Sequence, residues 1–176
     1  MRTVNQSIVL LFALPLLVGG GPDPGILLEI DRASFVLTAR DLRDASEGPQ
    51  IPVVLGSPAH PTPSGTFSVT GVVDRPEWAP GPNARAAGAH RVASSIHGPM
   101  GVAKIPFGRR GVALHGGADP RLLGKPVSLG CARTADADLL GLLDWLEDRG
   151  ALGPSRHLAS GESRRSFRRP TRIRVR

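Results

Sequence analysis

One cysteine and one histidine in this chain have residue types and a spacing that could support nucleophilic chemistry. Cys131 is the chain's one cysteine, and His115 precedes it by sixteen residues. A free thiol has a pKa of about 8.5 and is mostly protonated at neutral pH, so a nucleophilic cysteine needs an imidazole to take its proton. The loop between the two residues can double back and place their side chains together. We interpret Cys131 as a nucleophile and His115 as its base.

Residues next to this pair could orient the imidazole and stabilise developing charge. Gly130 permits a tight turn into Cys131, which leaves the amide N–H groups of both residues available to an oxyanion. The Gly116 carbonyl is the nearest acceptor in sequence for the second imidazole nitrogen. Arg133 could bind a substrate carboxylate, and its spacing fits a structural ion pair equally well.

The same side chains could instead have a structural role or bind a metal. A lone cysteine can be a small buried hydrophobic residue, although an unpaired thiol in an exported protein favours a functional sulfur. A zinc site built from His97, His115 and Cys131 lacks any Cys-x-x-Cys or His-x-x-x-His spacing. We therefore expect neither a metal nor another cofactor.

Short strands and turns are expected to position these residues. The chain contains 22 Gly and 17 Pro, and aromatic residues make up 4% of it, which indicates a mainly β fold. Alternation and apolar runs predict strands at 26–30, 34–39, 51–55, 66–72, 91–96 and 111–115, and a short helical piece at 119–123.

One clear helix is predicted after the cysteine, over residues 135–149. Thr134 is a candidate N-cap, Asp136 and Asp138 lie near the positive end of the helix, and Gly150 is a natural stop. An apolar face for core packing is formed by Leu139, Leu142, Leu143 and Leu146.

The two ends of the chain differ from its middle. Residues 1–21 have the charged start, apolar centre and small residues of a signal peptide, or of an N-terminal anchor. Residues 22–150 form the expected catalytic domain, with fourteen basic and fourteen acidic residues in 1–150. Residues 151–176 carry eight arginines against one acidic residue, and we expect a disordered Arg-rich tail. The tail could contact anionic envelope polymers or lipids, an interaction that salt should weaken, and nucleic acid is not an expected partner.

A stretch dominated by Gly, Pro, Ala and Arg, residues 74–111, is typical of a functional or mobile segment. Trp78 within it either plugs an edge of the core or forms a wall of a substrate groove. His97, followed by Gly98, imitates His115-Gly116 and is either a loop residue or a substrate contact. Both remain candidate substrate-binding residues, together with Arg133.

Three motifs in the same order resemble the L,D-transpeptidase (YkuD-type) catalytic domain. The first is an opening hairpin at 26–37, and the second is the Thr-Pro-x-Gly-x-Phe-like turn at 62–67. The third is His-Gly at 115–116 followed by Ser-Leu-Gly-Cys-Ala-Arg at 128–133, which resembles the family's His-Gly and Ser-His-Gly-Cys-x-Arg. The resemblance covers about 26–148.

The resemblance implies a β-sandwich or barrel-like domain with one or two short helices, located in the periplasm or cell envelope. It implies a peptidoglycan enzyme whose cysteine attacks a stem tetrapeptide, releases the terminal D-alanine and passes the acyl group to an amine of another stem. Cys131 would be the nucleophile and His115 the base. Gly116 would orient the imidazole, and the amides of Gly130 and Cys131 would bind the oxyanion.

One departure from the family motif keeps other functions open. Leu129 stands where the family usually has histidine, and Ser128 is retained. An L,D-carboxypeptidase or amidase would use the same acyl-enzyme with a different acceptor, and a catalytically inactive relative would only bind peptidoglycan. A papain-like hydrolase is disfavoured, because its cysteine precedes its histidine in the chain.

Overall fold

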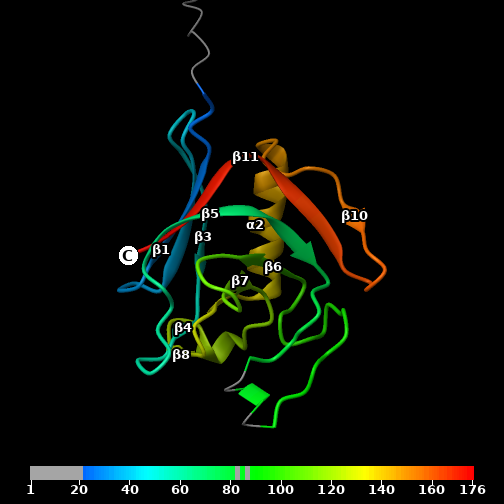
Figure 1. The fold of residues 1–176 in the computed structure, drawn as a ribbon. Helices are drawn as coiled ribbons and strands as arrows, with labels where there is room; N and C mark the ends of the chain where they lie inside the picture. Colours follow the sequence, from blue (N-terminus) through cyan, green and yellow to red (C-terminus); the bar gives the residue numbers. More distant parts are fainter. Residues whose placement is uncertain (1–21, 82–83, 86–87) are drawn as a thin grey trace, which may run out of the picture.

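The computed structural model describes residues 22–81, 84–85 and 88–176, and within them most strands join one curled sheet (Figure 1). The expected mainly β fold is confirmed. The sheet has the strand order β3-β2-β1-β11-β5-β6-β7-β9, and β10 pairs with β11. Its strands are β1 (Ile26–Asp31), β2 (Val36–Asp41), β3 (Ser46–Pro52), β5 (Gly65–Asp74), β6 (Ala103–Pro106), β7 (Ala113–His115), β9 (Ala132–Arg133), β10 (Arg156–His157) and β11 (Ser163–Val175).

Four further elements of the described chain lie outside this sheet. β4 (Leu55–Gly56) and β8 (Pro126–Ser128) pair as a small parallel sheet of their own. A short 3₁₀ turn, η1 (Pro120–Leu122), is capped by Asp119 and agrees with the expected helical piece. The helix α2 (Asp136–Asp148) lies across one face of the curled sheet (Figure 1).

The core lies between the sheet and α2. The hairpin predicted at the start of the chain is confirmed, since β1 and β2 pair antiparallel with Ile26 opposite Asp41. Alternate residues of β1 point into the core, as a strand with one covered face requires. The predicted apolar face of the helix is also buried, and the cluster includes Ile26, Leu28, Ile30, Leu139, Leu142, Leu143 and Leu146.

The C-terminal segment is the central strand of the sheet, so the expectation of a disordered tail at 151–176 is wrong. β11 runs parallel to β1 and antiparallel to β5 (Figure 1). Thr171, Ile173 and Val175 are buried, whereas Arg172 and Arg174 between them are exposed. A period of two is the pattern of a half-buried strand. A count of charges over residues 151–176 predicts disorder because it ignores the alternation of exposed arginines with buried residues.

Several arginines of β11 form ion pairs within the fold. Arg165 pairs with Asp74 of β5 and with Glu147 of α2, and Arg174 pairs with Glu29 of β1. The folded domain therefore extends through β11, beyond the boundary expected at residue 150. Contact between the remaining arginines and anionic envelope polymers stays a prediction.

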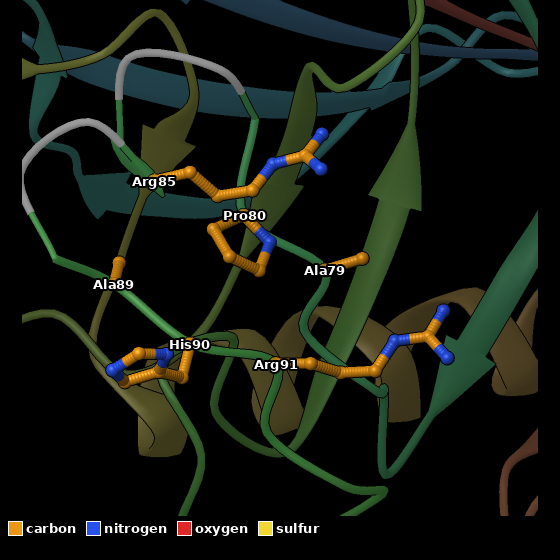
Figure 2. A pocket seen from close by; sticks show the side chains of 6 residues that line it. All are labelled: Ala79, Pro80, Arg85, Ala89, His90 and Arg91. Atoms are coloured by element: carbon orange, nitrogen blue, oxygen red, sulfur yellow. The ribbon is translucent and has the colours of Figure 1, made fainter.

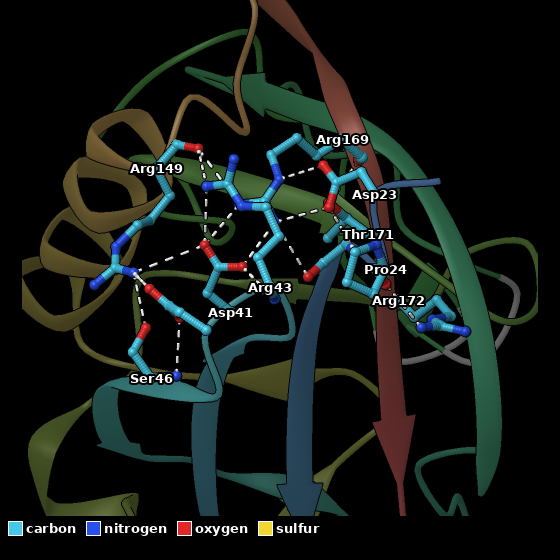
Figure 3. Close-up of polar contacts among 11 residues, drawn as sticks. Asp23, Pro24, Asp41, Arg43, Ser46, Arg149, Arg169, Thr171 and Arg172 are labelled. Carbon is cyan, nitrogen blue, oxygen red and sulfur yellow. Dashed lines mark hydrogen bonds and ion pairs between the residues drawn. The ribbon is translucent and has the colours of Figure 1, made fainter. Parts of the chain in front are cut away.

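Arg169 is the buried centre of the largest ionic cluster (Figure 3). Its guanidinium donates to Asp41 at 2.7 Å through two nitrogens, and to Asp23 at 2.6 and 2.9 Å. Hydrogen bonds from Arg169 hold the pKa of the Asp41 carboxyl well below its ordinary value of 3.8. The cluster joins β11, β2 and the segment before β1, three parts that are far apart in sequence.

Two local predictions are wrong. Thr134 does not cap the helix, because its hydroxyl donates to the Pro52 carbonyl at 2.9 Å and the N-cap position is Ala135, without a side-chain cap. Residues 91–96 form no strand, and only Val92 pairs, through an isolated bridge to Trp78. Gly150 ends the helix as expected, with a φ of 63°.

The predicted signal peptide or anchor at 1–21 lies outside the described residues. Among the helices of the described segments, none is long and apolar enough to cross a membrane.

Candidate active site

Parallel pairing of two short strands brings His115 and Cys131 to the same place. β7 ends at His115, β9 begins directly after Cys131, and the register sets His115 opposite Arg133. Both residues line one cavity of about 1050 Å³. The cysteine and histidine that the sequence singles out therefore share a cavity.

His115 is held in one tautomer and kept neutral. Its ring is 3% exposed, and Nδ1–H donates to the Gly116 carbonyl at 2.7 Å. Since a carbonyl can only accept, Nε2 carries no proton and remains an acceptor. Burial lowers the pKa of His115 to about 4, and the Gly116 hydrogen bond opposes this shift, while the positive charges of Arg133 and Lys104 add to it.

Cys131 is half-buried and rests as a protonated thiol. Its Sγ lies 3.6 Å from the Gly111 carbonyl, to which the S–H donates. Burial raises the pKa of Cys131, and a backbone hydrogen bond at Ala113 and the charge of Arg133 act in the opposite direction. Thiol and imidazole are thus both neutral at pH 7, and the cysteine needs a base to become a nucleophile.

Ser128 fixes the turn that presents the thiol. Its buried hydroxyl donates to the Cys131 carbonyl at 2.6 Å and accepts from the Gly130 N–H at 3.1 Å. The Gly130 amide is therefore occupied, which corrects its expected role as an oxyanion donor. The Cys131 N–H has no hydrogen-bond partner among the described residues. Gly130 has a φ of 115°, as the tight turn requires.

The cavity is strongly cationic. Five Lys and Arg side chains line it, whereas Glu77 is its one acidic lining residue among the described part of the chain. No ion pair joins Arg109, Arg110 or Arg133 to a described carboxylate. Such a field favours substrates that carry carboxylates. The five lining cations are Arg85, Lys104, Arg109, Arg110 and Arg133.

Sequence reasoning singled out Arg133 and missed Arg109 and Arg110. The available signal was a pair of cations between Gly108 and Gly111, directly before the strand that ends at the histidine. Because β7 and β9 are parallel, a turn just before β7 lies at the same edge of the sheet as Cys131, which comes just before β9.

The remaining candidates divide into residues inside and outside the cavity. Trp78 is half-buried and lines it, as the groove-wall interpretation expects. Leu129 lines it as well and is 54% exposed. His97 is exposed and does not line the cavity, which agrees with its interpretation as a loop residue, and a substrate contact by His97 stays a prediction.

A second, smaller hollow of about 420 Å³ adjoins the first (Figure 2). Figure 2 shows basic side chains of Arg85, His90 and Arg91 around it, and none of its described lining residues is a nucleophile such as cysteine or serine. Cys131 and His115 make the larger cavity the candidate active site.

Comparison with known proteins identifies the family and the fold of the chain. The family model of the L,D-transpeptidase catalytic domain matches residues 26–158. No curated protein matches the chain. Three solved structures share its fold at low identity, and each aligns with 86% of this chain: L,D-transpeptidase 3 from Mycobacterium tuberculosis with a faropenem-derived adduct (16% identity, TM-score 0.58), an Enterococcus faecium L,D-transpeptidase carrying a cysteine-to-serine mutation (17%, 0.57) and LD transpeptidase LdtMt1 in complex with imipenem (16%, 0.53).

The chain is shorter than these relatives. It spans 60%, 50% and 59% of their respective lengths. The likeness therefore concerns the fold of one domain.

Proposed function

Because the chain belongs to the L,D-transpeptidase catalytic-domain family, we propose that it is an exported enzyme that remodels peptidoglycan stem peptides through a Cys131 thioester. One observation carries the proposal: a protonated thiol and a neutral imidazole with a fixed tautomer line the same cationic cavity. This pairing provides a nucleophile and a proton acceptor at neutral pH. We place its action in the cell envelope, where the substrate is found.

The first half-reaction is acylation of Cys131. His115 Nε2 takes the thiol proton while Sγ attacks the carbonyl carbon between the third residue of a tetrapeptide stem and its terminal D-alanine. The unpartnered Cys131 N–H faces the developing oxyanion. The tetrahedral intermediate collapses when the imidazolium returns its proton to the departing amine, which releases D-alanine and leaves a thioester.

The second half-reaction decides the outcome. An amine of a neighbouring stem attacks the thioester and gives up a proton to His115, which yields a cross-link and regenerates the thiol. Water in place of the amine yields a tripeptide, which is carboxypeptidase activity. The cavity volume of about 1050 Å³ supports binding of an acceptor as well as a donor, and this favours the transpeptidase.

Positive charge in the cavity recognises the carboxylates of the stem peptide. Arg133 lies opposite His115 in the register and is positioned to bind a carboxylate of the donor stem. Trp78 and Leu129 supply apolar walls. Leu129 is not needed for proton transfer to His115, so the minimal machinery is complete without the family's usual histidine.

A defined donor tests the activity. We expect residues 22–176, incubated with a disaccharide-tetrapeptide, to release one D-alanine for each cross-linked dimer formed. Product masses separate the dimer from the tripeptide that hydrolysis would give. The segment 22–176 is used because β11 is part of the sheet.

A matched control is Cys131→Ala, which removes the nucleophile and keeps the backbone. D-alanine release that continues in this variant would contradict the thioester. A wild-type chain that binds the stem without releasing D-alanine would instead identify a non-catalytic peptidoglycan-binding relative.

A further inference from the structure

We infer that Asp136 is a positioning residue for His115, acting through the peptide group between Gly116 and Gly117. The inference rests on the proposed function, because it assigns a role in the same proton transfer. Asp136 is the first residue of α2, and its Oδ1 accepts from the Gly117 N–H at 3.0 Å and from the Val102 N–H at 2.9 Å.

One peptide group connects the carboxylate to the imidazole. The Gly117 N–H, bound by Asp136, and the Gly116 C=O, bound by His115 Nδ1–H at 2.7 Å, belong to the same planar unit. A carboxylate on the N–H end fixes the direction of the carbonyl and polarises it as an acceptor. Asp136 therefore stands one peptide group behind the imidazole, where many histidine bases have a carboxylate in direct contact.

The backbone is shaped to admit this carboxylate. A Cβ added at Gly116 would lie 2.0 Å from Asp136 Oδ1, and one added at Gly101 would lie 2.2 Å from it. Glycine at both positions lets the side chain reach the backbone amides. Gly117 has a φ of 72°, a left-handed conformation that glycine adopts easily.

Charge adds to the geometric role. Three charged groups from the elements packed against His115 influence its protonation: Lys104 on β6 and Arg133 on β9 disfavour the imidazolium, and Asp136 on α2 favours it. The Asp136 carboxylate thus offsets two cations when His115 takes the thiol proton. The N-terminus of α2 stabilises the carboxylate in turn.

Two substitutions separate orientation from charge. Asp136→Asn retains an Oδ1 acceptor and loses the charge, whereas Asp136→Ala loses both. The matched control is Asp138→Asn, which removes the same charge from the same first turn of α2 and has no hydrogen bond to the loops of the site among the described residues.

The first readout is the rate of Cys131 acylation by imipenem as a function of pH. We expect Asp136→Ala to lose roughly 10- to 100-fold, as other outer partners of a functional imidazole do, and Asp136→Asn to lose less. On the acidic side of the pH profile, the acylation rate falls where His115 becomes protonated, at a pKa of about 4. Loss of the Asp136 charge disfavours the imidazolium, so this fall in rate, the acidic limb, should move to lower pH in both Asp136 variants. Asp138→Asn should match wild type in both rate and acidic limb.

The second readout does not need activity. Imidazole nitrogen shifts from NMR report the His115 tautomer in the free chain, and we expect Nδ1–H in wild type and Asp136→Asn but a mixture in Asp136→Ala. Unchanged tautomer, rate and acidic limb in both Asp136 variants would overturn the inference. If Asp136→Ala does not fold, Asp136→Asn decides through its rate and acidic limb. A wild-type chain with the Nδ1–H tautomer that imipenem does not acylate would count against the proposed function alone.

Discussion

Replacing His115 by glutamine should slow acylation of Cys131 about 10²- to 10⁴-fold at pH 7. Burial raises the pKa of the Cys131 thiol, so few molecules hold a thiolate without help from a base. Glutamine can still donate to the Gly116 carbonyl but cannot take the proton. Single-turnover reaction with imipenem, followed by absorbance, measures the rate.

A matched histidine variant and a pH series test whether the loss in rate comes from the missing base. His97→Gln changes a histidine that also precedes glycine but lies outside the cavity, and it should react at the wild-type rate. His115→Gln should recover about tenfold per pH unit on the alkaline side, because hydroxide replaces the missing base. Wild-type speed in His115→Gln at pH 7, with an unchanged melting temperature, would show that the thiol is activated without the imidazole.

Replacing Arg169 by methionine should cost about 3–5 kcal/mol of unfolding free energy. The substitution leaves the Asp41 carboxylate, which is fully buried, without the guanidinium that compensates its charge. It also releases Asp23 and thereby loosens the start of β1 from β11. Denaturant unfolding of residues 22–176 measures the loss.

The control for this change is Arg172→Met on the exposed face of the same strand, which should cost little. The pH dependence gives a second check. The pKa of Asp41 is depressed in the folded state, so its contribution is present above 3.8 and is lost as pH falls through the folded value. Arg169→Met should remove this part of the acid sensitivity. Equal stability of the Arg169 and Arg172 variants would contradict the role of the cluster.

The sequence was most informative where chemistry depends on neighbours in the chain. The types and spacing of Cys131 and His115 predict that the two residues lie together, and both line one cavity. The predicted contact between His115 Nδ1 and the Gly116 carbonyl is also present. The opening hairpin and the buried leucine face were also predictable, because each follows from a local period.

Predictions failed where a long-range contact decides the structure. Thr134 does not cap the helix because its hydroxyl donates to the carbonyl of Pro52, which is distant in sequence. Asp136 was noticed only for its place near the helix start, since the amides it binds lie 34 and 19 residues away. Arg169 was counted as tail charge, because its partner Asp41 is 128 residues distant.

Formation of an acyl-enzyme on Cys131 would be seen in the mass of the chain after exposure to imipenem. LdtMt1, which shares the fold, has been solved in complex with this compound. We predict that residues 22–176 gain one imipenem mass, that peptide mapping locates it on Cys131, and that Cys131→Ala gains none. A folded wild-type chain that keeps its unmodified mass, or an adduct found on another residue, would show that Cys131 is not the nucleophile.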